Sequence, residues 1–184
     1  MNIANFVTSI RLLALVPLLW TIALGDKNGA WICLFWYLFA GGTDILDGFL
    51  ARKLGLVSKF GAMLDLLADR LLTLSVFIGL LYRGNGEVLV LIISLILIGR
   101  DFFVAGLNEI YPNQLDIKVT NIEKTKVALQ FIGLGILLAP NFVIFGSANQ
   151  SHGMGLVILS ASAAICAYTI FVYALKAKSL PNDK

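Results

Sequence analysis

The stretch of this chain that decides its fold runs from residue 44 to residue 69 and reads DILDGFLARKLGLVSKFGAMLDLLAD. Four aspartates stand in it among apolar residues: Asp44, Asp47, Asp65 and Asp69. The first two are three residues apart and the last two are four apart, so each pair falls on one face of a helix. The long apolar runs that hold the two pairs predict consecutive membrane-spanning helices, joined by a short turn around residues 53–58.

The composition of the whole chain indicates an integral membrane protein. Of its 184 residues, 59% are hydrophobic and 14% are charged, and the mean hydropathy is +0.88. Soluble domains average roughly 45–50% apolar and about 25% charged residues. Disordered, coiled-coil and disulfide-stapled secreted chains are therefore excluded, and Cys33 and Cys166 are expected to be small buried hydrophobes. The net charge of +3 gives no reason to expect nucleic acid as a partner.

Six apolar stretches predict six transmembrane helices, at residues 6–24, 30–51, 60–81, 88–107, 127–140 and 155–174, the fifth together with its polar lead-in. Glycine-rich segments at 25–29, 83–86 and 146–153 predict turns between them. We therefore expect an all-α polytopic fold with one membrane domain over residues 1–184. The first stretch also has features of a signal peptide, with Arg11 before an apolar core and a cleavage-like Ala23-x-Gly25.

The basic residues predict the orientation of the helices. Nine of them fall after the second stretch, after the fourth and in the tail: Arg52, Lys53, Lys59, Lys118, Lys124, Lys126, Lys176, Lys178 and Lys184. The alternate loops hold two, Lys27 and Arg83. By the positive-inside rule, both termini face the cytoplasm, in a cell (inner) membrane.

The four aspartates need an explanation, because together they would cost roughly 10 kcal/mol if they faced lipid. Carboxylates crowded near one membrane surface repel one another unless divalent cations neutralise them. A set of oxygen ligands without nearby His or Cys suits Mg²⁺ or Mn²⁺. Two alternatives are buried ion pairs with Arg52, Arg70 and Arg100, or the pathway of a small ion or proton transporter.

Small residues and an arginine accompany these acids. Gly48 follows the second aspartate and Gly61 precedes the third by four residues, so a bulky anionic ligand can approach both helices closely. Arg52 offers a planar fork for phosphate oxygens. Together with a pair of metal ions, these residues are suited to holding a diphosphate.

Residues 44–69 match without a gap the pattern D-x2-D-G-x2-A-R-x8-G-x3-D-x3-D, which resembles the signature of the CDP-alcohol phosphatidyltransferases. The resemblance implies transfer of a phosphatidyl group from CDP-diacylglycerol to an alcohol, with release of CMP, in phospholipid biosynthesis. It also implies two Mg²⁺ or Mn²⁺ ions on Asp44, Asp47, Asp65 and Asp69, with Asp69 as general base. A homodimer is usual in such enzymes.

The resemblance extends to contacts with the CDP-lipid. Asn5-x-x-Thr8-x-x-Arg11 is similar to the nucleotide-contacting stretch at the amino terminus of these enzymes. The positions that it implies for binding nucleotide and diphosphate are Asn5, Thr8, Gly48, Arg52, Ser58 and Gly61.

Two later segments, 97–109 and 122–130, look like stretches of the phosphatidylglycerophosphate synthases within that family. Arg100, Lys124 and Lys126 could form a cationic pocket for the phosphate of glycerol 3-phosphate. Glu123 departs from this pattern by adding an acid beside the pocket. Phosphatidylglycerol, as in cardiolipin synthases, and inositol, inositol phosphate or serine remain alternative acceptors. The lysines could also be simple positive-inside anchors.

Overall fold

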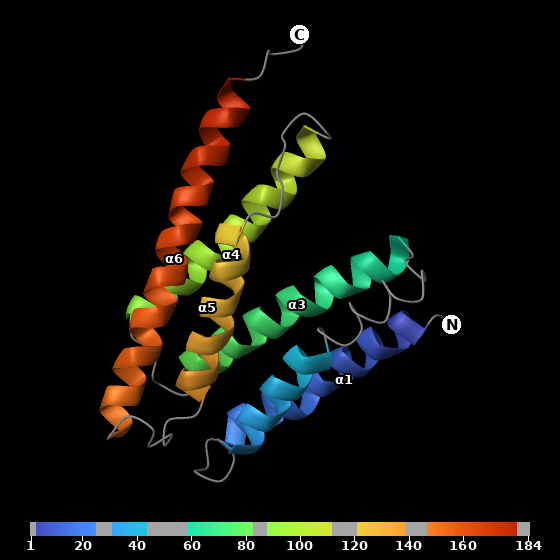
Figure 1. Ribbon diagram of the computed structural model, residues 1–184. Helices are drawn as coiled ribbons and strands as arrows, with labels where there is room; N and C mark the ends of the chain where they lie inside the picture. Colours follow the sequence, from blue (N-terminus) through green and yellow to red (C-terminus); the bar gives the residue numbers. More distant parts are fainter. Residues whose placement is uncertain are drawn as a thin grey trace.

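The structure is a computed structural model that describes residues 3–24, 31–43, 59–82, 88–111, 121–138 and 147–179. These residues form helices α1 (Ile3–Leu24), α3 (Lys59–Leu80), α4 (Val88–Ile110), α5 (Asn121–Leu138) and α6 (Ala148–Lys178), and a helical segment over Trp31–Thr43 (Figure 1). The predicted all-helical fold is confirmed. Two of the described helices, α4 and the Gln150–Lys178 part of α6, are long and apolar enough to cross a membrane.

Of the last two helices, only the second begins earlier than predicted. α5 begins at Asn121 and so includes the polar lead-in before the apolar stretch at residue 127. α6 begins at Ala148, so the turn predicted over 146–153 is wrong from residue 148 onward. The reason is a cap: Ser147 has an extended backbone, and its side chain accepts a hydrogen bond from the Gln150 backbone N at 3.3 Å. A serine in this position satisfies the first amide groups, so polar residues form the first turns of α6.

The helices form two groups that meet at α3. α1 packs along α3, and α6 packs along both α4 and α5, while α3 also contacts α4 and α5 (Figure 1). One apolar core draws on all six helices, and its most deeply buried members include Leu18, Tyr37, Phe77, Leu134 and Leu159. Burial of this shared core fixes α3 between the two groups.

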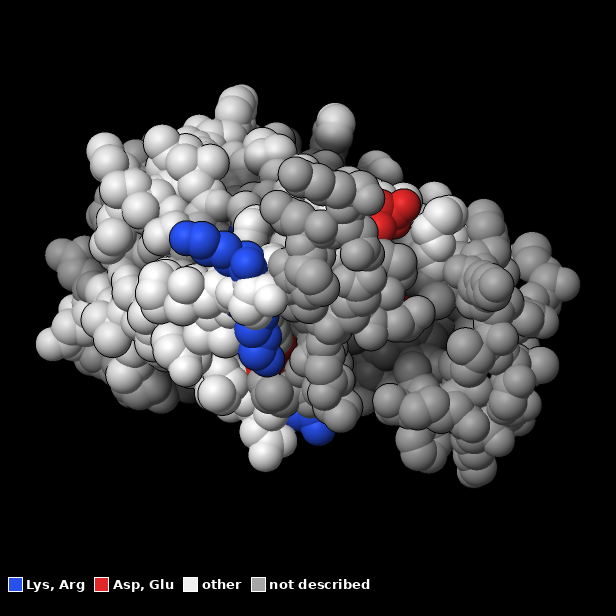
Figure 2. All heavy atoms as spheres, turned by 90° about the horizontal axis from the view of Figure 1, so that it is seen from above, with Lys and Arg blue, Asp and Glu red and all other residues white. Residues whose placement is uncertain are grey.

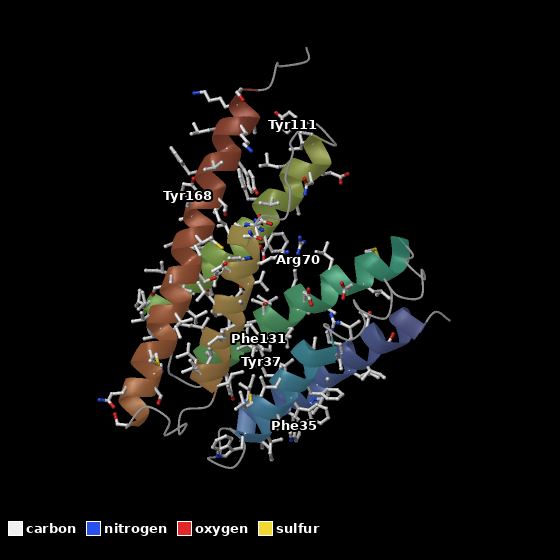
Figure 3. All side chains as sticks on the ribbon, in the orientation of Figure 1. Phe35, Tyr37, Arg70, Tyr111, Phe131 and Tyr168 are labelled. Carbon is white, nitrogen blue, oxygen red and sulfur yellow. The ribbon has the colours of Figure 1, made fainter. Side chains whose placement is uncertain are left out.

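Close packing joins the helical segment Trp31–Thr43 to α5. The Tyr37 and Phe131 rings stack with their centroids 4.7 Å apart, and the Tyr37 hydroxyl donates to the Phe131 carbonyl oxygen at 3.1 Å (Figure 3). Gly41 lies against the same ring, where a Cβ atom would be 2.3 Å from Phe131 Cε2. Small residues that let backbones approach in this way are typical of helix contacts inside membranes.

Large apolar side chains also cover the outside of the helices. Leu13, Val88 and Val157, from three different helices, are each 69–71% exposed. A soluble monomer rarely exposes apolar surface on this scale, whereas a lipid-facing surface requires it. The exterior therefore agrees with the membrane assignment.

The ends of the helices alternate along the chain. The beginnings of α1, α3 and α5 and the ends of α4 and α6 point toward the upper or right-hand part of the view in Figure 1. Figure 2 looks down on the molecule from above and shows basic side chains on that face. Lys124, Lys176 and Lys178 are the exposed lysines near these ends. The described lysines Lys124, Lys176 and Lys178 thus lie near the same ends of the helices.

Candidate functional site

Two of the predicted metal ligands lie on α3 and face α1. The Arg11 guanidinium donates from Nη1 to Asp65 Oδ1 at 2.9 Å and to Asp69 Oδ1 at 3.1 Å. The Arg11 side chain is fully buried, whereas the Asp65 and Asp69 side chains are 45% and 52% exposed. One buried cation therefore holds two carboxylates that remain open on their outer side. We call Arg11, Asp65 and Asp69 the α1–α3 acid cluster.

The cluster has the chemistry that a hard cation needs. Both Oδ1 atoms converge on one nitrogen, the carboxylates keep exposed surface, and their oxygens are the ligands that Mg²⁺ and Mn²⁺ prefer. Among the described residues, no three His, Cys, Asp or Glu side chains lie close enough together to hold a metal ion. The other two predicted ligands, Asp44 and Asp47, lie outside the described residues. The residues present thus fit a metal site to which α3 contributes two ligands, and the four-aspartate set stays a prediction.

The pairing of Arg11 with Asp65 and Asp69 was not predicted, although the sequence analysis named Arg11 in the Asn5-x-x-Thr8-x-x-Arg11 stretch. The alternative of ion pairs named Arg52, Arg70 and Arg100, whereas the arginine found on Asp65 and Asp69 is Arg11 of α1. Arg52 lies outside the described residues. Arg70 reaches from α3 toward α4, where its Cζ lies 5.8 Å from the centroid of the Phe102 ring (Figure 3). The available signal was an arginine inside an apolar run, three residues after Thr8, which is also buried.

The predicted nucleotide contacts are described only in part. Gly48, Arg52 and Ser58 lie outside the described residues. Gly61 is in the first turn of α3, four residues before Asp65, and so shares its face of the helix. Asn5 and Thr8 are in the first turns of α1, the helix that packs along α3. Asn5, Thr8 and Gly61 thus lie on the same two helices as the α1–α3 acid cluster, a few residues away along the chain.

A second set of charged side chains joins α4, α5 and α6. Arg100 donates from Nη2 to Glu123 Oε1, from Nη1 to Asp101 Oδ1 at 3.2 Å, and from Nε to Thr169 Oγ1 at 3.5 Å. Lys126 Nζ donates to Asp101 Oδ1 at 3.0 Å, and the Tyr173 hydroxyl donates to Glu123 Oε1 at 3.2 Å. We call this set the α4–α6 charge cluster: Arg100, Asp101, Glu123, Lys126, Thr169 and Tyr173.

The structure therefore brings together two of the three cations predicted for the acceptor pocket, and both are paired with acids. Arg100 and Lys126 are brought together, with side chains 10% and 6% exposed, whereas Lys124 is exposed on the surface of α5. Asp101 and Glu123 balance the two cations, so the cluster is neutral overall. Asp101 and Tyr173 were not expected in this pocket, because the sequence does not show which helices meet.

An open groove runs between α5 and α6, on the outer side of the α4–α6 charge cluster. Its lining is almost entirely apolar and consists of Asn121, Ile122, Thr125, Ala164, Ile165 and Tyr168. Tyr168 points outward from α6 (Figure 3). Asp65 and Asp69 are not among the residues that line this open groove.

Comparison with known proteins places the chain in a family. The family model for CDP-alcohol phosphatidyltransferases matches residues 1–175. The chain belongs to this family, and its two α3 aspartates stand at positions of the signature identified in the sequence.

Curated relatives indicate two kinds of enzyme within the family. A CDP-diacylglycerol–glycerol-3-phosphate 3-phosphatidyltransferase of Rickettsia bellii is 33% identical over 138 residues, which cover 74% of this chain and 75% of the relative. The protein of the same name from Cereibacter sphaeroides is 36% identical over 139 residues, covering 74% and 62%. A CMP-forming cardiolipin synthase of Oryza sativa is 30% identical over 185 residues, covering 92% and 56%.

Proposed function

We propose that this protein transfers the phosphatidyl group of CDP-diacylglycerol to the hydroxyl of glycerol 3-phosphate and releases CMP. The observation that carries the proposal is the α1–α3 acid cluster, in which two signature aspartates share one face of α3 and converge on Arg11. Membership of the CDP-alcohol phosphatidyltransferase family supports this reaction rather than ion or proton transport.

In the proposed reaction, Asp69 accepts the proton of the acceptor hydroxyl. The hydroxyl oxygen forms a bond to the phosphorus that carries the diacylglycerol, and the bond from that phosphorus to the CMP oxygen breaks. Arg11 holds the Asp65 and Asp69 carboxylates in place from the buried side of the cluster. Asn5, Thr8, Gly48, Arg52, Ser58 and Gly61 are the residues proposed to bind the nucleotide and diphosphate.

Two Mg²⁺ or Mn²⁺ ions, proposed to bind Asp44, Asp47, Asp65 and Asp69, would supply positive charge that offsets the carboxylates and the diphosphate. The exposed outer sides of Asp65 and Asp69 support this assignment. On the acceptor side, Arg100 and Lys126 are proposed to bind the phosphate, with Lys124 at the surface of α5 guiding it in.

The proposed setting is a cell (inner) membrane crossed six times, with both termini and the active site on the cytoplasmic side. The excess of basic residues in alternate segments supports this orientation. A soluble acceptor then reaches the diphosphate while the acyl chains of the CDP-lipid stay in the bilayer. A homodimer is proposed as the assembled form.

The experiment that tests the function is an acceptor screen with the purified protein in detergent. CMP release should require Mg²⁺ or Mn²⁺ and CDP-diacylglycerol, and should appear with glycerol 3-phosphate. An inactive Asp69→Asn variant prepared in the same way controls for contaminating enzymes. No CMP release with glycerol 3-phosphate, phosphatidylglycerol, inositol, inositol phosphate or serine would refute the proposal.

Phosphatidylglycerol is the second candidate acceptor, because of the apolar groove beside the α4–α6 charge cluster. Ile122 and Thr125 in its lining stand next in the chain to Glu123 and Lys126. A lipid acceptor could lay an acyl chain in this groove while its headgroup reaches Arg100 and Lys126. CMP release with phosphatidylglycerol but not with glycerol 3-phosphate would select this alternative.

A further inference from the structure

In the α4–α6 charge cluster, each nitrogen of the Arg100 guanidinium already donates to an acceptor. A guanidinium binds phosphate best through two parallel N–H groups. In Arg100, Nη1 donates to Asp101 and Nη2 donates to Glu123, while Nε donates to Thr169. A phosphoryl group can therefore take the position at Nη2 only by displacing the Glu123 carboxylate.

The two carboxylates have different positions in the cluster. Asp101 bridges the two cations, since its Oδ1 accepts from both Arg100 Nη1 and Lys126 Nζ, and it stands next to Arg100 on α4. Glu123 contacts Arg100 but comes from another helix, in the first turn of α5. Asp101 thus holds the two cations together, whereas Glu123 occupies the Nη2 end of the fork.

Glu123 also has the surroundings that a phosphoryl group would need. The Tyr173 hydroxyl donates to Glu123 Oε1 at 3.2 Å, and the Arg100 guanidinium donates to the same oxygen. The beginning of α5 adds the partial positive charge of a helix amino terminus, which favours a carboxylate or a phosphate alike. The donors that hold this carboxylate are suited to an anionic oxygen of a ligand.

We infer that Glu123 is an internal competitor for the phosphoryl group of the acceptor and so sets the affinity and selectivity of the pocket. This inference rests on the proposed function of Arg100 and Lys126. When the acceptor binds, its phosphoryl oxygens replace the Glu123 carboxylate on Arg100 and Tyr173. Small anions that make too few other contacts cannot displace Glu123, so the neutral cluster excludes them.

Substitution Glu123→Gln tests this directly, because glutamine keeps the size of the side chain and removes its charge. A charge-assisted hydrogen bond exceeds a neutral one by about 1–1.5 kcal/mol, so the KM for glycerol 3-phosphate should fall about five- to tenfold. The KM for CDP-diacylglycerol should not change. With phosphatidylglycerol as acceptor the fall should be smaller, since a phosphodiester carries one charge fewer than a monoester. Comparing the two falls in KM thereby distinguishes a soluble phosphate monoester from a lipid headgroup as the ligand of the pocket.

A matched control and a second variant keep the test decisive. Glu109→Gln removes one exposed acid from α4 outside the cluster and should leave both KM values unchanged. Glu123→Asp keeps the charge but shortens the reach, and should give an intermediate fall in KM for the acceptor. If Glu123→Gln does not fold, the aspartate variant still gives the direction of the effect.

Binding can be followed without turnover by the thermal unfolding of the purified protein. Inorganic phosphate and glycerol 3-phosphate should each raise the Tm of Glu123→Gln more than that of the unsubstituted protein. The inference would be overturned if, in both Glu123 variants, the KM for the acceptor did not fall and the phosphate-induced rise in Tm was no larger than in the unsubstituted protein. Failure of the unsubstituted protein to release CMP with any acceptor would instead refute the proposed function, and the Tm comparison would still decide the role of Glu123.

Discussion

The two charged clusters of this protein differ in how their charges are balanced. In the α1–α3 acid cluster, one buried cation meets two half-exposed carboxylates. In the α4–α6 charge cluster, two cations meet two carboxylates, and all four side chains are largely buried. Buried charges in a membrane protein need partners. Among the contacts of the described residues, the neutral cluster pairs each cation with an acid, whereas Asp65 and Asp69 share Arg11 and keep exposed surface.

This difference predicts first that divalent cations act on one cluster alone. EDTA should abolish CMP release, and Mg²⁺ or Mn²⁺ should restore it. At a metal concentration of 100 times Kd, the ion should stabilise the folded protein by about 2.7 kcal/mol, which is measured as a rise in Tm in detergent.

The matched variants locate this effect. The double variant Asp65→Asn, Asp69→Asn should lose the rise in Tm, whereas Asp101→Asn, the same chemical change in the neutral cluster, should keep it. An equal rise in all three proteins would place the metal elsewhere.

The next largest effect is expected from Asp69→Asn. Loss of a general base should lower the rate of CMP release by roughly 10²–10⁴-fold, while binding of a CDP nucleotide largely persists. Steady-state turnover and nucleotide titration measure the two quantities separately. Turnover within tenfold of the unsubstituted protein would remove Asp69 from the proposed role.

Lys126→Ala should act on the acceptor. The loss of a charged hydrogen bond in a buried site predicts a KM for the alcohol about tenfold higher, with a smaller change for CDP-diacylglycerol. Lys178→Ala is the matched control, because Lys178 is exposed near the end of α6, outside the acceptor residues, and should change the KM by less than about twofold. A loss of CDP-lipid binding in Lys126→Ala would contradict the acceptor assignment.

The smallest effect is expected from Arg11→Gln and concerns stability. Without the guanidinium, Asp65 and Asp69 repel each other, and the free energy of unfolding should fall by about 1–2 kcal/mol in the absence of divalent ions. Saturating Mg²⁺ should recover part of this loss, since it supplies positive charge to the same carboxylates. Arg70→Gln, which alters an arginine next in the chain to Asp69, should show no such recovery.

Part of this site could be predicted because it depends only on the geometry of one helix. Asp65 and Asp69 are one turn apart, so any α-helix through them presents both carboxylates on one face. The position of Gly61, one turn before Asp65 on the same face, follows from the same reasoning. Their partner Arg11 comes from a helix more than fifty residues earlier in the chain, and three other arginines were equally available to sequence reasoning.

The acceptor side shows the same limit. Arg100 and Lys126 were expected to lie together, and they do, but Lys124 was grouped with them although it faces outward. Glu123 was recognised as an unexpected acid, yet its pairing with Arg100 and Tyr173 depends on how α4, α5 and α6 pack. The longer α6 was missed because the cap at Ser147 is a local contact that hydropathy does not show.

The sequence by itself determined the helical class, the spacing of the signature aspartates and the family to which the chain belongs. These properties follow from composition and from the fixed rotation per residue within a helix. Tertiary structure decided which cation meets which acid: Arg11 meets Asp65 and Asp69, while Arg100 meets Asp101 and Glu123. Contacts between helices depend on the packing of side chains from distant segments, which small residues such as Gly41 permit and which no local spacing specifies.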